Sequence, residues 1–179
     1  WCGRLRAYFV AASPSTLVAT LPTARYHRAQ VKATGDIEVA SAVGESRSML
    51  VQRGPLKSPV DIMVAAATHG PSLVIVPTVL RARLFASSLK RHGFSVAVLP
   101  DEWDSAAGGV DVVIGSRTAV FARVPHLRSV VVIDEHDDSL REERTPTWHA
   151  RDVAIERAQQ LGISCVLVSA LPSVATKVW

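Results

Sequence analysis

From residue 58 onward, short continuous runs of apolar residues alternate with segments in which apolar residues recur at helical spacing. Runs rich in Val, Ile and Leu are typical of strands that are buried on both faces of a parallel sheet. The predicted strands are Leu73–Val76, Ser95–Leu99, Val110–Ile114, Ser129–Ile133 and Ser164–Val168. The predicted helices are Val60–Thr68, Val79–His92 and His149–Leu161. This alternation predicts an α/β fold with three layers and a mainly parallel sheet.

The residues before this region lack a comparable regularity. We expect a helix at Trp1–Val10 and strands at Thr16–Leu21, around Ile37–Val39 and at Met49–Gln52, separated by Ser, Pro, Gly and Thr clusters. We therefore interpret residues 1–55 as an irregular N-terminal connector, the tail of an upstream DNA-binding region, and residues 56–179 as the globular lobe.

Composition narrows the class of protein. Apolar residues make up 48% of the chain, and no apolar run approaches the length of about 20 residues needed to cross a bilayer. Cys2 and Cys165 form no metal-binding set and no signal-peptide pattern opens the chain, so we expect a cytoplasmic protein without membrane contact. Residues 1–57 hold eight Lys and Arg against Asp36, Glu38 and Glu45. That excess suits a nucleic-acid backbone, although a solvated basic surface explains it as well.

The acidic run after the predicted strand Ser129–Ile133 is the main candidate for chemistry. Ligands gather at the carboxyl ends of parallel strands, and there the sequence reads Asp134, Glu135, His136, Asp137 and Asp138. In phosphoryl-transfer motors, an acid at this position holds Mg²⁺ and the next one orients the attacking water. Asp134 is thus the candidate metal ligand, and Asp134 and Glu135 are the candidate catalytic pair. The alternative is an acidic turn that merely ends a strand.

Further motifs accompany the acidic run in a fixed order. Trp148, the segment His149-Ala150-Arg151-Asp152 and the segment Ser169-Ala170-Leu171-Pro172-Ser173 follow it, and Val112 to Leu127 precedes it. Together they resemble the DEEH motif, the aromatic-rich loop, the H-A-R-D and G-S-A-T-P-S segments and the V-I-G-T-R-S-A-L-F segment of the PriA family of bacterial replication-restart helicases. The resemblance extends over residues 50–176 and implies the RecA-like first lobe of a superfamily 2, DEAD/DEAH-like helicase.

The resemblance also implies partners and site residues. The expected ligands are forked DNA and single-strand/duplex junctions, with ATP and Mg²⁺ if the lobe is active, and the expected protein partners are replication-restart proteins and single-strand-binding protein. The second lobe and the family's zinc-binding cysteines are expected beyond Trp179, so zinc is not expected in this segment. The residues implied in DNA binding or coupling are Arg117, Thr118, Trp148, His149, Arg151 and Ser169. A helix cap at Ser116 or Thr118 explains the turn around Arg117 nearly as well, and Trp148 has the alternative of packing against the protein.

The phosphate loop departs from the family pattern. The stretch VQRGPLKSPVD offers Gly54, Lys57 and Ser58 as candidate nucleotide-binding residues. Leu56 and Val51 replace the two glycines of a Walker A loop, and Pro55 and Pro59 remove backbone N–H donors. We therefore interpret the loop as degenerate and favour an ordinary turn between strand and helix. In this respect the chain resembles divergent actinobacterial members of the family.

The acidic motif can be aligned with the family pattern in two ways. An alignment through His136 and His149 without gaps places the family's metal-binding Asp on Ile133, whereas a shift by one residue makes Asp134 and Glu135 the pair.

Three hypotheses follow for the function. The chain is a degenerate lobe that binds branched DNA without turning over ATP, a working lobe of an ATP-dependent 3′–5′ DNA helicase, or a small-molecule α/β enzyme with an acidic metal site.

Overall fold

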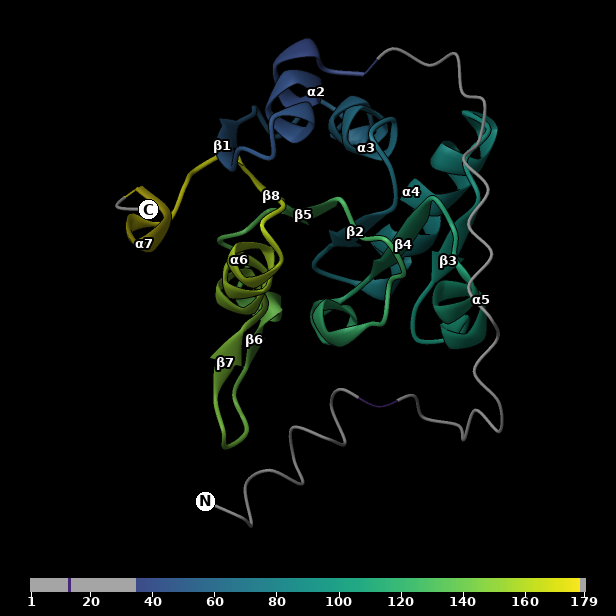
Figure 1. Cartoon of the computed structure of the whole chain (residues 1–179). Coiled ribbons are helices and arrows are strands. Elements are labelled where there is room, and N and C mark those ends of the chain that lie inside the picture. The colour runs from purple at the N-terminus through teal and green to yellow at the C-terminus, as the bar shows by residue number, and fades with distance from the viewer. Residues whose placement is uncertain (1–12, 14–34, 178–179) are drawn as a thin grey trace.

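The computed structural model describes residue 13 and residues 35–177, and its central feature is a six-stranded parallel sheet. The strand order is β1-β8-β5-β2-β4-β3 (Figure 1). The strands are β1 (Met49–Gln52), β2 (Ser72–Ile75), β3 (Val96–Val98), β4 (Val112–Gly115), β5 (Ser129–Ile133) and β8 (Ser164–Ser169). The predicted three-layer α/β fold is confirmed, and it is the architecture expected of a RecA-like lobe.

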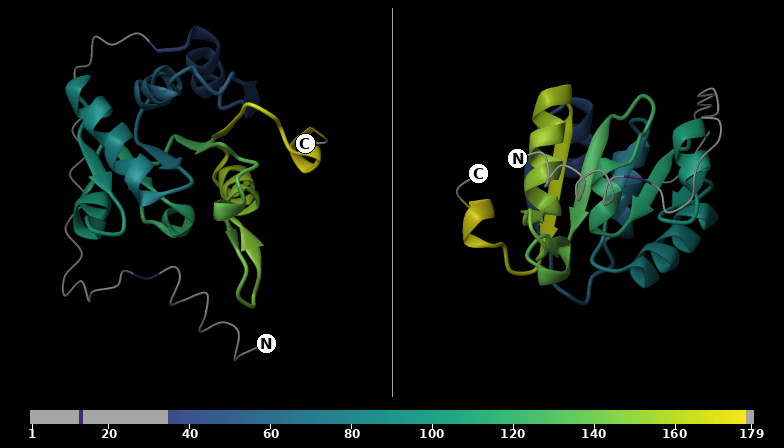
Figure 2. Two further views of the ribbon diagram at one scale, coloured as in Figure 1. Left: turned by 180° about the vertical axis from the view of Figure 1, so that it is seen from behind. Right: turned by 90° about the horizontal axis from the view of Figure 1, so that it is seen from below.

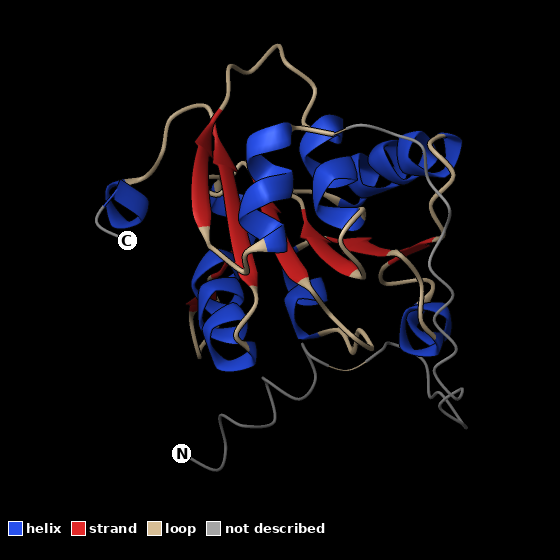
Figure 3. Ribbon diagram, turned by 45° about the horizontal axis from the view of Figure 1, so that its top comes forward, coloured by secondary structure: helices blue, strands red, loops and turns tan. Residues whose placement is uncertain are grey.

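The sheet is buried on both faces because alternate residues of each strand enter different halves of the core. Val131 and Val166 pack on one side, and Val130 and Leu167 pack on the other. Helices α2 (Ile37–Gly44), α3 (Val60–Ala67) and α4 (Val79–Arg91) cover the first face. Helix α5 (Trp103–Gly108), the 3₁₀ turn η1 (Arg117–Phe121) and helix α6 (Ala150–Leu161) cover the second face (Figures 1 and 3).

The ends of the long helices follow the capping rules. Helix α4 begins after Thr78, whose hydroxyl accepts a hydrogen bond from the backbone N–H of Arg81, and it ends before Gly93, which has φ +93°. Helix α6 ends at Gly162, which adopts the left-handed conformation that glycine reaches without steric cost. The two glycine caps expected from the sequence are therefore confirmed, to within a residue of the predicted helix ends.

The region before residue 55 differs from the expectation in two ways. Ile37–Val39, expected as a strand, begins helix α2. The Asp36 carboxylate accepts hydrogen bonds from the backbone N–H groups of Glu38 and Val39, and the helical conformation buries Val39 and Val43 on one face. Met49–Gln52 is a strand as predicted, but it pairs in parallel with β8, so the sheet includes residues assigned to the connector. The elements predicted at Trp1–Val10 and Thr16–Leu21 lie outside the described residues.

Three short elements project from the sheet or close its loops. The 3₁₀ turn η2 (Asp138–Leu140) leads into a two-stranded antiparallel ribbon, β6 (Arg141–Glu142) and β7 (Trp148–His149). Helix α7 (Val174–Lys177) follows β8 and stands to one side of the body in two further views (Figures 2 and 3). None of the helices in the described part has the length and apolarity that a bilayer span requires.

Candidate functional site at the carboxyl edge of the sheet

A cavity of about 500 Å³ lies where the carboxyl ends of β1, β5 and β8 meet. Its lining includes the loop 53–59 between β1 and α3, Arg81 and Phe85 of α4, Ile133 and Asp134 at the end of β5, and residues 168–170. The structure therefore brings together the predicted residues Gly54, Lys57, Ser58, Asp134 and Ser169. This is the edge at which parallel sheets bind their ligands.

The loop 53–59 offers few backbone donors to this cavity. The N–H of Arg53 donates to the carbonyl oxygen of Ser169 at 2.9 Å, and the N–H of Lys57 donates to the carbonyl oxygen of Gly54 at 3.0 Å. Prolines 55 and 59 have no N–H. In the described part of the chain, the N–H groups of Gly54, Leu56 and Ser58 have no protein acceptor. These residues alternate with ones whose N–H is absent or already engaged, so no two successive donors are available to wrap a phosphate.

The side chain of Arg53 is also engaged within the protein. Its guanidinium lies 2.6 Å from the carboxylate of Asp61 and 4.0 Å from that of Asp36. Asp61 lies in the first turn of α3, and Asp36 caps the start of α2. The pairing holds the loop against those helices and leaves the exposed Lys57 as the cation of the loop that has no carboxylate partner in the described region.

Asp134, the candidate metal ligand, forms an ion pair with Arg81 of α4. Asp134 follows β5 directly and has φ +51°, a conformation that Asp tolerates better than most residues. Arg81 also lies over the ring of Phe85, 5.6 Å from its centroid. The carboxylate that sequence reasoning assigned to a metal therefore faces a guanidinium.

Glu135, the other half of the predicted catalytic pair, is completely buried and does not line the cavity. Its carboxylate accepts hydrogen bonds from Arg151 at 3.1 Å, from the backbone N–H of Ser173 at 2.8 Å and from the hydroxyl of Thr176 at 2.8 Å. Burial opposes its ionisation, but these hydrogen bonds outweigh burial and hold the pKa of Glu135 below its ordinary value. The network ties the end of β5 to the starts of α6 and α7.

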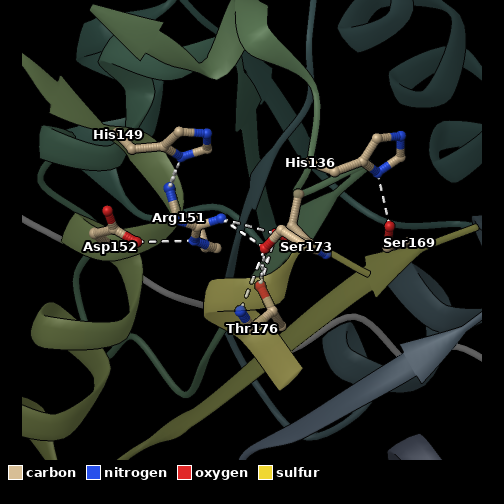
Figure 4. Close-up of polar contacts among 8 residues, drawn as sticks. His136, His149, Arg151, Asp152, Ser169, Ser173 and Thr176 are labelled. Carbon is tan, nitrogen blue, oxygen red and sulfur yellow. Dashed lines mark hydrogen bonds and ion pairs between the residues drawn. The ribbon is translucent and has the colours of Figure 1, made fainter. Parts of the chain in front are cut away.

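Arg151 is the centre of this network (Figure 4). It also pairs with Asp152 at 2.8 Å and donates to the hydroxyl of Ser173 at 2.9 Å. Burial lowers the pKa of Arg151, but the hydrogen bonds and charges of its two acidic partners raise the pKa by more, so the net shift is upward. The guanidinium is a permanent charge that is almost fully enclosed by protein partners.

Two histidines flank the network in the same view (Figure 4). The Nδ1 of His136 lies 2.6 Å from the hydroxyl of the buried Ser169, which joins the acidic run to the end of β8. The Nδ1 of His149 accepts a hydrogen bond from the backbone N–H of Arg151 and so caps α6. Burial, followed by the nearby charge of Arg151, lowers the pKa of His149.

The remaining DNA-binding candidates form a second group around η1. The Arg117 guanidinium donates to the carboxylate of Glu142 at 3.1 Å and to the carbonyl oxygen of Ser139 at 3.4 Å. Trp148 packs edge-on against Phe121, with 5.0 Å between ring centroids, and Thr118 is half-buried. In this conformation Arg117 and Trp148 hold the β6–β7 ribbon against η1, and a role for them in DNA contact stays a prediction.

Comparisons with known proteins point in one direction. No protein-family model matches the chain. The chain is 42% identical over 72 residues to replication restart protein PriA of Haemophilus influenzae, a match that covers 40% of this chain and 10% of the relative. It is 33% identical over 113 residues to PriA of Bacillus subtilis, covering 57% of this chain and 14% of the relative. It is 31% identical over 124 residues to PriA of Chlamydia trachomatis, covering 63% of this chain and 16% of the relative.

This chain is PriA-like. The resemblance stated from the motifs is confirmed by relatives from several bacteria. The chain spans only about a tenth to a sixth of the length of the PriA proteins that it matches.

The side chains of this PriA-like chain do not fit a Mg²⁺-bound nucleoside triphosphate. Asp134 is paired with Arg81, Glu135 is enclosed by Arg151 and the α7 segment, and a buried isoleucine, Ile133, lines the cavity where one alignment places the metal-binding Asp. Across residues 35–177, no three His, Cys, Asp or Glu side chains gather to hold a metal ion. The five residues of the acidic run thus have separate partners or face solvent.

Sequence reasoning missed three residues that pair with the site's charged groups. Arg81, Asp61 and Thr176 each occupy a helix and carry no motif of their own. A signal for Arg81 was present, because it lies in the first turn after β2 at the ligand-binding edge of the sheet. Its partner, Asp134, could not be predicted from the sequence, because the pairing depends on which strands are neighbours in the sheet.

Proposed function

We propose that this chain forms the first helicase lobe of a PriA-like replication-restart protein, and that the lobe engages branched DNA without turning over ATP. The observation that carries the proposal is the state of the acidic pair. Arg81 neutralises Asp134, and Arg151 holds Glu135 in a buried network. In this conformation Asp134 can hold a metal only beside the Arg81 cation, and Glu135 does not reach the cavity.

The DNA-binding half of the proposal is supported by the relatives' name, replication restart protein, and by unpaired surface charge. Several exposed cations have no carboxylate partner within the described range; they are Lys57, Lys90, Arg91, Arg123, Arg128 and Arg141. Unpaired Lys and Arg bind phosphate and release counterions. Replication-restart proteins and single-strand-binding protein are the partners that the family resemblance suggests for the parent protein.

Affinity for forked DNA, measured by fluorescence anisotropy at two salt concentrations, tests this proposal. With about four phosphate contacts, affinity is expected to fall about a hundredfold between ~50 and ~200 mM salt. An affinity that does not change with salt, or no binding at all, would contradict the proposal and favour a small-molecule enzyme.

Two substitutions separate direct from indirect DNA contact by Arg117. If Arg117 binds a phosphate, Arg117→Ala weakens binding, whereas Glu142→Gln, which releases the same guanidinium, maintains or strengthens it. If Arg117 only positions the β6–β7 ribbon, both substitutions break the same ion pair and weaken binding alike.

A working ATPase is the second candidate, and one observation favours it. Lys57, Ser58 and Asp134 line the same cavity, as the residues of a phosphate loop and a metal-binding strand end do. Titration with ATP and Mg²⁺ separates the two functions. The degenerate lobe gives no saturable binding and no effect of Lys57→Ala, whereas an ATPase gives saturable binding that Lys57→Ala abolishes.

A further inference from the structure

Arg81 and Asp134 occupy the part of the cavity where a metal ion would be needed. Among the described residues that line the cavity, Asp134 is the only one with a carboxylate. The cations in that lining are Arg53, Lys57 and Arg81. Arg53 is paired with Asp36 and Asp61 behind the loop, so the charge of Asp134 is balanced from within the cavity by Arg81.

Contacts on several sides fix the position of the Arg81 cation. The backbone N–H of Arg81 donates to the hydroxyl of Thr78 at 3.2 Å, which starts helix α4. The guanidinium pairs with Asp134 and lies over the ring of Phe85 at 5.6 Å. Thr78 and Phe85 therefore restrict the backbone and the side chain of Arg81, respectively.

Asp134 is held in place by its own backbone. It leaves β5 with φ +51°, and its carbonyl oxygen accepts a hydrogen bond from the N–H of Asp137 at 2.8 Å. This turn directs the carboxylate to α4. The Ser169 hydroxyl is engaged by His136, and the Ser58 hydroxyl accepts a hydrogen bond from the N–H of Val60, so Asp134 is the anionic ligand that the described lining offers to a metal.

We propose that Arg81 is a resident cation that takes the place of a divalent metal in this cavity. A metal ion that approaches Asp134 meets the positive charge of the guanidinium on the same carboxylate, so the intact pair disfavours metal at the strand end. The inference deepens the proposed function, since it gives a reason for the lack of ATP turnover. It is independent of DNA binding, because it concerns one ion pair and can be measured without DNA or nucleotide.

Paramagnetic broadening by Mn²⁺ tests the proposal in the whole 179-residue chain. Substoichiometric Mn²⁺ is added to ¹⁵N-labelled protein, and the amide signals of residues 134 and 169 and of the loop 53–59 are followed. The wild-type chain and Asp134→Asn are expected to give the same weak response at these amides. Arg81→Gln, which releases the carboxylate, is expected to increase the broadening severalfold, and Arg81→Gln combined with Asp134→Asn is expected to remove that increase.

Arg83→Gln provides the matched control. Arg83 lies on the same helix and pairs with Asp101 at 2.8 Å, so its substitution also releases one carboxylate, but outside the cavity lining. It is expected to leave the cavity amides unchanged.

Two results would overturn the inference. One is broadening of the wild-type cavity signals that Asp134→Asn abolishes, which would mean that a metal already binds beside Arg81. The other is a folded Arg81→Gln chain whose cavity signals remain as sharp as those of the wild type. The first result can be obtained even if Arg81→Gln does not fold. A failure to bind forked DNA would leave this experiment unaffected.

Discussion

Asp134 and Glu135 are neighbours in the sequence, and each is paired with an arginine, but their surroundings are opposite. The side chains of Glu135 and Arg151 are 0% and 10% exposed, whereas those of Asp134 and Arg81 are 28% and 39% exposed. Glu135 also accepts hydrogen bonds from Ser173 and Thr176. Two adjacent acids can therefore serve different purposes, because burial makes one an internal anchor of the fold and leaves the other at the wall of a cavity.

The buried pair should give the largest effect when it is broken. Glu135→Leu removes the acceptor of the network and leaves the Arg151 guanidinium enclosed with Asp152 as its remaining acidic partner. Removal of one member of a buried pair costs about 3–5 kcal/mol of folding free energy. We expect a loss near the lower figure because Asp152 remains, measured by urea unfolding. A loss below about 1 kcal/mol would mean that the network contributes no more than a surface pair.

Acid should weaken the same pair without a mutation. Because the folded pKa of Glu135 lies below its ordinary value of 4.5, the network stabilises the fold above that pH, and this contribution is lost as the pH falls through the folded pKa. The difference in free energy of unfolding between wild type and Glu135→Gln is therefore expected to shrink between pH ~5 and pH ~2. A difference that stays constant over this range would show that the pKa of Glu135 is the same in the folded and the unfolded chain.

The partly exposed pair should give a smaller and salt-dependent effect. A double-mutant cycle of Arg81→Gln and Asp134→Asn is expected to give a coupling energy of about 0.2–1 kcal/mol, because solvent screens both groups. The coupling should decrease when the salt concentration is raised to ~1 M. The equivalent cycle for Arg151 and Glu135 should be larger and nearly independent of salt. Equal values for the two cycles would remove the distinction drawn between them.

Lys57→Ala should have the smallest effect of all. Lys57 is exposed, and no carboxylate pairs with it in the part of the chain that the structure describes. Surface substitutions of this kind change stability by less than about 0.5 kcal/mol. Thermal unfolding of the variant should match that of the wild type both with and without ATP and Mg²⁺. Stabilisation of the wild type alone by the nucleotide would favour the ATPase candidate.

Much of the fold was predictable from the sequence because the strands are buried on both faces. A strand such as Ser129–Ile133 has no polar face, so its apolar run marks its limits directly, and the predicted and observed bounds agree. Ile37–Val39 was misread because its few apolar letters suit a strand as well as a helix. The helix is decided by the Asp36 cap and by the burial of Val39 and Val43 against the sheet and its neighbouring helix.

The site was predictable in its location but not in its contacts. The residues after the strands mark the carboxyl edge of the sheet, which is why Asp134 and Ser169 were found in advance. Their partners depend on the order of strands, because β8 lies between β1 and β5, and on which helix packs beside each strand end. The sequence could not indicate that Arg81 and Arg151 would reach adjacent acids from different helices.

The pairing of β1 with β8 has a consequence for synthesis of the chain. Residues 49–52 pair with residues 166–169, so on the ribosome β1 emerges long before its neighbour in the sheet. Until β8 is inserted between β1 and β5, the edges of these two strands that face each other remain unpaired, and the part of the cavity wall formed by residues 168–170 is missing. The cavity is therefore complete only once β8 has joined the sheet.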